Sequence, residues 1–330
     1  MKRILIASLL SCVLVGGAFA QLTFTGDVYA GFEIDSPYGE EASYTTNHRD
    51  EGPSQFNLAA NVLRENYGAK LDLKFQATDS PLSLTGAYGW VDFLNNSLTL
   101  TMGKISDAKW VSSLDSDHEY FFDDVTGFRL NYKAPIQGLN LGAAFPARNF
   151  DVDLFFKKII LGATYANLMF NTVIAYDLGN NARFLFGFNY TGIDELTSAG
   201  IQIKASNLAT WDSELVGGEC IVNEKIGYRV TRPFIISLFA SQIFYGTPDT
   251  DTELIFAPAI SYKFTPTLTA SFTWEFNSPD YFKTTNSVIT PCLEYTLKGP
   301  AVFYVQYSVE LAEMKNASHK FGFGMDIKAF

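Results

Sequence analysis

The residue types that usually carry catalysis are scarce in this sequence. Its three histidines, His48, His118 and His319, lie in or beside predicted loops, and none belongs to a recognisable nucleophile or metal-ligand motif. The acidic run from Asp115 to Glu119 could offer oxygens to a divalent cation, but it lacks the glycine-turn spacing of a calcium loop, which favours a solvated loop. No glycine-rich phosphate loop is present in the sequence. We therefore expect no enzymatic activity, no bound metal and no cofactor.

Charged residues recur instead at alternate positions of predicted strands. Between Tyr67 and Ala77 the odd positions are apolar, and the even positions place Lys70, Asp72 and Lys74 on the other face. Charges of both signs along a narrow aqueous path create a transverse field that sorts solutes by charge and dipole. We expect eight such side chains to line a pore: Lys70, Asp72, Lys74, Arg129, Lys133, Lys204, Glu275 and Glu294.

The elements that position these charges are strands, because apolar and polar residues alternate almost from Gln21 to the end of the chain. From Leu22 to Ile34 every even position is apolar or small, and most odd positions are polar. Segments of this kind predict 18 strands in an all-β chain. The stretch 193–229 is the least regular, and loss of one hairpin there would leave 16.

The length of the apolar faces of the predicted strands indicates that the strands cross a membrane. Phe184, Phe186, Phe188 and Tyr190 form one unbroken apolar face, and such segments match the 9–11 residues that cross a bilayer obliquely, whereas soluble strands average about 5–6. Tight turns also alternate with longer polar connections, the longest being 35–54 and 106–125. We predict a transmembrane antiparallel β-barrel over residues 21–330. An extracellular sandwich or propeller is the alternative.

The first twenty residues predict export. Lys2 and Arg3 precede an apolar run that ends in Ala18-Phe19-Ala20, the small-x-small form of a signal-peptidase site, so residues 1–20 are expected to be a cleaved signal peptide. A lipoprotein signal presenting Cys12 is the rival interpretation. The formal net charge of −11 disfavours nucleic acid as a partner. Cys220 and Cys292 are too few for a disulfide framework, and two free thiols are favoured over one bridge.

The segment after the fifth predicted strand carries six carboxylates: Asp107, Asp115, Asp117, Glu119, Asp123 and Asp124. Here, and through Gly127–Pro135 and Gly138–Asn140, the sequence resembles the bacterial general porin family of the outer membrane. The resemblance implies that the loop 106–125 folds into the barrel as an acidic constriction facing a basic wall. It also implies that the terminal aromatic Phe330 is the signal read by the barrel-assembly machinery.

Two positions depart from the family pattern. Lys104 stands where the family often has a basic wall residue, yet alternation places it on the lipid face with Leu98, Leu100 and Met102 unless a bulge at Gly103 turns it inward. The C-terminal dry face runs from Phe321 to Ala329 in odd positions, so Phe330 is out of phase with it.

The functional expectation is a porin-like channel in the cell outer membrane, open to passive diffusion of small hydrophilic solutes and ions. Its partners would be outer-membrane lipid, the assembly machinery and the solutes, and assembly as a homotrimer stays open. The alternative function is a non-conducting surface protein or adhesin anchored by a barrel.

Overall fold

A computed structural model describes residues 21–49, 52–77, 82–105, 125–146, 159–178, 183–190, 196–206, 218–246, 252–280, 285–297, 301–312 and 316–328, without the side chains of Val125, Pro146 and Ser198. The predicted signal peptide, the six carboxylates of the acidic segment and Phe330 lie outside these residues.

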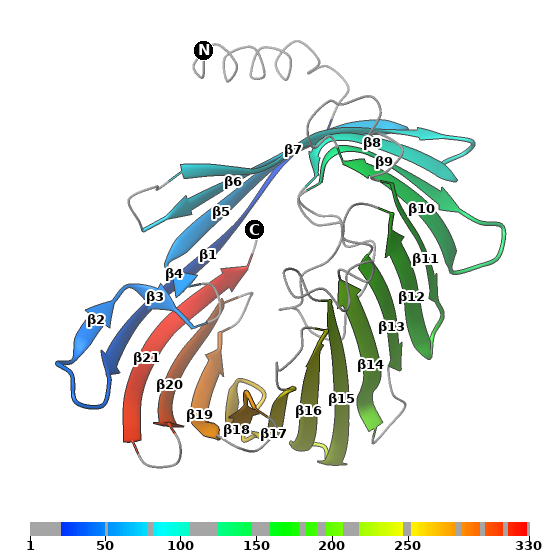
Figure 1. The fold of residues 1–330 in the computed structure, drawn as a ribbon. Helices are drawn as coiled ribbons and strands as arrows, with labels where there is room; N and C mark the ends of the chain where they lie inside the picture. The colour runs from blue at the N-terminus through cyan, green and yellow to red at the C-terminus, as the bar shows by residue number, and fades with distance from the viewer. Residues whose placement is uncertain are drawn as a thin grey trace.

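Eighteen long strands form one closed antiparallel wall, in which each strand pairs with its neighbours in the chain (Figure 1). The ring closes because β1 pairs with β5 on one side and with β21 on the other. The prediction of 18 strands rather than 16 is confirmed. The wall strands are β1 (Gln21–Ser36), β5 (Gln55–Leu63), β6 (Tyr67–Gln76), β7 (Leu82–Phe93), β8 (Leu98–Ile105), β9 (Val125–Lys133), β10 (Leu139–Pro146), β11 (Ile160–Ala166), β12 (Phe170–Asp177), β13 (Arg183–Tyr190), β14 (Leu196–Ser206), β15 (Glu219–Thr231), β16 (Phe234–Tyr245), β17 (Glu253–Lys263), β18 (Leu268–Ser278), β19 (Asn286–Thr296), β20 (Ala301–Ala312) and β21 (Asn316–Lys328).

Three short strands interrupt the connection between β1 and β5, where the sequence predicts only a loop. β2 (Ser43–Thr45) pairs with the end of β1, and β3 (Asn47–His48) pairs with β4 (Gly52–Pro53). This connection is therefore an ordered hairpin rather than a plain polar loop.

The distribution of exposed and buried side chains is the reverse of that in a water-soluble protein. Large apolar residues such as Phe24 and Trp274 point outward and are 61% and 42% exposed, whereas Gln202 and Asn223 point inward and are each 2% exposed. A closed wall leaves no unpaired strand edge, and its apolar exterior suits a hydrocarbon solvent. The fold is thus a transmembrane β-barrel, as predicted. Among the described residues, no helix is long and apolar enough to cross a membrane.

The connections at the two ends of the barrel differ in length. At one end the strands are joined by short turns such as 64–66, 94–97, 232–233 and 264–267, and at the other end by the longer intervals 37–54, 106–124, 147–159 and 207–218. Short turns face the periplasm and long loops face outward in barrels of this class. The connection that contains β2–β4 accordingly begins and ends at the outer end.

One β-bulge changes which residues of β7 point inward. Between Asp72 and Leu73 of β6 the pairing with β7 skips Thr85, whose hydroxyl donates a hydrogen bond to the Asp72 carbonyl oxygen at 3.3 Å. Leu82 and Leu84 consequently face outward, whereas Tyr88, which is two strand positions beyond Gly86, is 8% exposed and faces inward. A bulge re-aims the side chains that follow it.

Candidate functional site

The eight predicted pore-lining side chains all belong to the inner face of the wall. Lys70 and Asp72 of β6 form an ion pair of 3.2 Å along one strand. Lys204 pairs in register with Leu185, and Glu275 with Val288, both at inward positions. Lys74, Lys133 and Glu294 occupy inward positions of β6, β9 and β19. The strand register thus places these side chains on the inner face, and their role in permeation stays a prediction.

Arg129 lies apart from the lysines of β6. It pairs in register with Thr101 of β8 and Ala144 of β10, and the strands β7 and β8 stand between it and Lys70. The described residues therefore do not bring Arg129 and the Lys70/Lys74 pair into one basic cluster, although all three face the lumen.

An apolar inner wall surrounds the position of Arg129. Its side chains point inward from β7 to β13 yet are almost completely buried, with Ile105 at 0% and Ile160 and Leu185 at 1% exposure. Trp90 packs against them. The full set is Tyr88, Ile105, Ala144, Ile160, Val173, Ala175 and Leu185. This side of the barrel interior is a packed surface and not a wall open to water.

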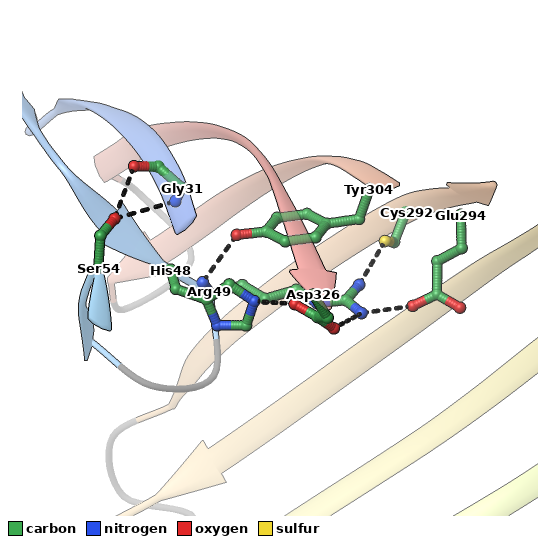
Figure 2. A network of polar contacts seen from close by, with 8 residues as sticks. All are labelled: Gly31, His48, Arg49, Ser54, Cys292, Glu294, Tyr304 and Asp326. Carbon is green, nitrogen blue, oxygen red and sulfur yellow. Dashed lines mark hydrogen bonds and ion pairs between the residues drawn. The ribbon is translucent and has the colours of Figure 1, made fainter. Parts of the chain in front are cut away.

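On the opposite side of the ring, residues 46–49 and 52–54 form the two arms of a hairpin that turns into the barrel, here called the inward hairpin. Its base is closed by the Ser54 amide, which donates to the Thr46 carbonyl oxygen at 2.8 Å. The Ser54 hydroxyl also donates to the same oxygen at 2.7 Å and accepts from the Gly31 amide at 3.0 Å. Figure 2 shows Ser54 joined to Gly31 in this way. One serine thus fixes the hairpin to β1.

The tip of the inward hairpin crosses the inner face of β19, β20 and β21 (Figure 2). His48 Nε2 contacts Asp326 Oδ1, and the His48 ring lies edge-on to Tyr304 at 5.2 Å between centroids. His48 itself is 2% exposed. A histidine that the sequence places in a loop is therefore a buried anchor.

Arg49 makes the most contacts in this network. Its Nη2 lies 2.6 Å from Glu294 Oε1 and 4.0 Å from Asp326 Oδ2, and its Nη1 lies 3.1 Å from Cys292 Sγ. The guanidinium stacks over the Tyr304 ring at 4.2 Å, and the Arg49 amide donates to the Tyr304 hydroxyl at 3.0 Å. A planar guanidinium suits this combination of carboxylate pairing and aromatic stacking.

Two glycines make room for the hairpin. A Cβ atom on Gly31 would lie 2.3 Å from the Asn47 carbonyl oxygen and 2.9 Å from the His48 Cα, and one on Gly324 would lie 2.5 Å from the Tyr304 hydroxyl oxygen. Gly31 and Gly324 are register partners on the inner face of β1 and β21. Any larger residue at either position would occupy the space of the tip or of Tyr304.

Sequence reasoning missed Arg49, His48, Tyr304 and Asp326 as functional residues. Asp326 and Tyr304 do lie on the wet faces of their strands, so alternation could have placed them in the lumen. Glycines at two inward positions, 31 and 324, were the available signal of a close approach. Nothing local to residues 46–54 indicates which part of the wall they contact.

The structure also locates the two cysteines and Lys104, and it bears on metal binding. Cys220 and Cys292 are both free thiols, as favoured from the sequence. Lys104 pairs in register with Ala87 and donates from Nζ to the Leu84 carbonyl oxygen at 2.6 Å, on the outer face. Gly103 has a positive φ of 126°, yet the register continues unbroken past it, so no bulge turns Lys104 inward. Within the described ranges, no group of three or more His, Cys, Asp or Glu side chains is arranged to hold a metal ion.

Comparison with known proteins identifies the architecture. No protein-family model matches the sequence, and no curated protein is similar enough to match it. Among solved structures the barrel is similar to OccK5 (OpdH) of Pseudomonas aeruginosa, with 11% identity, a TM-score of 0.64 and coverage of 94% of this chain and 98% of that one. The outer membrane protein OprD of P. aeruginosa gives 11% identity, a TM-score of 0.59 and 94% coverage of each chain. The outer membrane channel DcaP of Acinetobacter baumannii gives 14% identity, a TM-score of 0.52 and coverage of 95% and 98%. The chain therefore has the fold of outer-membrane porins over 94–95% of its length.

Proposed function

We propose that the chain is an integral outer-membrane channel of the porin type, which lets small hydrophilic solutes and ions diffuse passively, and that it catalyses no reaction. The observation that carries the proposal is the inner face, where charged and amide side chains such as Lys70, Asp72 and Gln202 line a closed wall of 18 strands whose exterior is apolar. A barrel of this width leaves room for water, whereas one of 8 strands is filled by side chains.

The rival is a non-conducting surface protein that uses the barrel as an anchor. An anchor has no need of charged side chains inside, and it can be narrower and filled. The likeness of the fold to solved outer-membrane barrels, one of which is described as a channel, also supports the channel. Planar-bilayer recording of the purified protein separates the two. Stepwise conductance is the expected result, and stable insertion without conductance would favour the anchor.

We also propose that the acidic segment 106–124 contributes to the constriction. The apolar inner wall supports this, because Ile105, the residue directly before the segment, is fully buried at an inward position. Buried apolar side chains on a lumen wall offer a surface against which an infolded segment gains burial. The carboxylates Asp115, Asp117, Asp123 and Asp124 would then favour cations at the narrow point.

Replacing these four residues by Asn tests the constriction. The reversal potential across a salt gradient should move toward lower cation preference, and partial deletion of the segment should raise the conductance. If neither quantity changes, the segment lies outside the permeation path. Recognition of Phe330 by the assembly machinery and a homotrimeric assembly belong to the same proposal. The first is tested by deleting Phe330 and measuring the yield of folded barrel in the membrane.

A further inference from the structure

We propose that the inward hairpin 46–54 is a second, charge-compensating constriction of the pore, and that Arg49 is a specificity-determining residue for ions. This inference rests on the proposed channel function. The second constriction lies on the side of the barrel formed by β19, β20, β21 and β1. Residues 47–49 narrow the lumen, and the Arg49 guanidinium neutralises two carboxylates of the wall.

The hairpin covers the wall that it crosses. Tyr304, the fourth residue of β20, points inward but is only 2% exposed, and its partners are the ring of His48, the guanidinium of Arg49 and the Arg49 amide. An inward tyrosine in a pore open at this level would meet water. The buried state of Tyr304 and His48 therefore shows that the tip occupies part of the cross-section.

The covered wall is acidic, and the hairpin supplies the compensating charge. Glu294 of β19 and Asp326 of β21 both face the lumen, and Arg49 lies between them at 2.6 Å and 4.0 Å. The Arg49 side chain is 15% exposed and that of Glu294 is 34% exposed, so water screens this pair only in part. Charges near a low-dielectric wall act strongly on passing ions. Without Arg49, two carboxylates would present a local site that favours cations.

The seat of the hairpin is built into the wall at several independent points. Gly31 and Gly324 leave the space that Asn47, His48 and Tyr304 fill. Ser54 ties the base to β1. Because the contacts of the hairpin with the wall join residues 23 to 278 positions apart, its inward position follows from the closed barrel and not from the hairpin sequence alone.

The first experiment measures ion preference. Arg49→Gln removes the charge, and we expect the permeability ratio of K⁺ to Cl⁻ to rise about 3-fold or more as the two carboxylates lose their counter-charge. Arg49→Lys keeps the charge and should stay near the wild-type ratio. Asp50 and Glu51 follow in the sequence and are left unchanged, so the variants report on Arg49 alone.

Lys320→Gln is the matched control. Lys320 stands on the same side of the barrel and is 42% exposed, and its ion-pair partner at 3.2 Å is Glu33 of β1 and not a residue of the hairpin. Lys320→Gln removes the same charge as Arg49→Gln, and we expect it to change the permeability ratio of K⁺ to Cl⁻ by less than about 1.5-fold. Equal shifts in Arg49→Gln and Lys320→Gln would overturn the special role of Arg49, and so would an unchanged ratio in Arg49→Gln.

The second experiment does not require conduction. Cys292 faces the lumen under the Arg49 guanidinium, whereas Cys220 pairs in register with the outward Phe244, so a chain of residues 21–330 with Cys220→Ser leaves Cys292 as the reporter. With a neutral, water-soluble maleimide we expect Arg49→Gln to speed labelling of Cys292 about 5-fold or more. An unchanged or slower rate would mean that Arg49 does not cover the thiol.

The two proposals fail in different ways. A wild-type barrel that inserts but never conducts removes the channel function, and the labelling rates still report whether the hairpin covers Cys292. A conducting barrel whose labelling rate is the same in the parent and in Arg49→Gln overturns the hairpin inference and leaves the channel function standing.

Discussion

The two sides of the barrel interior are covered by different chemistry. The apolar inner wall between β7 and β13 buries side chains such as Ile160 and Val173 at inward positions, whereas the opposite side buries His48 and Tyr304 within a network of ion pairs and hydrogen bonds. Alternation of apolar and polar residues separates the inner from the outer face of a strand, but it does not distinguish these two inner surfaces. The difference shows that an inward side chain is not necessarily hydrated, because groups packed against the wall can exclude water from it.

The largest expected effect tests whether the apolar inner wall is shielded from water. Val173 is 3% exposed, and its register partners Thr164 and Gly187 are uncharged. We expect Val173→Asp to lower the free energy of unfolding by about 3–5 kcal/mol, since a buried carboxylate finds no partner there. Urea titration of the refolded barrel, followed by tryptophan fluorescence, measures the change.

Ser271→Asp provides the control on a partly exposed inward position of β18. Ser271→Asp should lower the free energy of unfolding by less than about 1 kcal/mol if this position meets water. Equal, small costs for both variants would mean that the two sides of the interior are hydrated alike, and the comparison would fail.

A smaller effect tests the seat of the inward hairpin. In Gly31→Ala the new methyl group would meet the Asn47 carbonyl oxygen and the His48 Cα, both backbone atoms, so we expect a loss of about 2–3 kcal/mol and faster labelling of Cys292. Gly322→Ala is the control on the same inner face, because its nearest neighbour is the Gln306 Cγ at 3.6 Å. That change should be neutral within about 0.5 kcal/mol. Indistinguishable stabilities would show that the hairpin is not seated on Gly31.

The smallest effect compares two histidines that the sequence treats alike. His48→Ala removes a buried partner of Asp326, and we expect a cost of about 1–2 kcal/mol. His319→Ala removes an exposed contact with the Tyr307 hydroxyl and should cost less than about 0.5 kcal/mol. The same urea titration compares the free energies of unfolding of the two variants. A reversed order would place the main anchor of the hairpin elsewhere than at His48.

Most of the wall was predictable because its rule is local. A strand between lipid and water must alternate, and this alternation located the strands, as the predicted segments Leu22–Ile34 and Tyr67–Ala77 show when compared with β1 (Gln21–Ser36) and β6 (Tyr67–Gln76). Irregularities escaped the rule. The bulge at Thr85 changes which alternate residues of β7 point inward. It arises from the pairing of β7 with Asp72 and Leu73 of β6, so the sequence of β7 alone does not predict it.

The sequence by itself predicted a barrel of 18 strands, with 16 as the alternative, and the inward or outward direction of most wall side chains, because apolar and polar residues alternate every two residues along each strand. Only the tertiary structure decided that residues 46–54 turn into the lumen and that Arg49 meets Glu294 and Cys292. Arg49 and Cys292 are 243 positions apart, and His48 and Asp326 are 278 apart. Such contacts form only when β1 closes against β21, because ring closure brings the start and the end of the chain onto one wall.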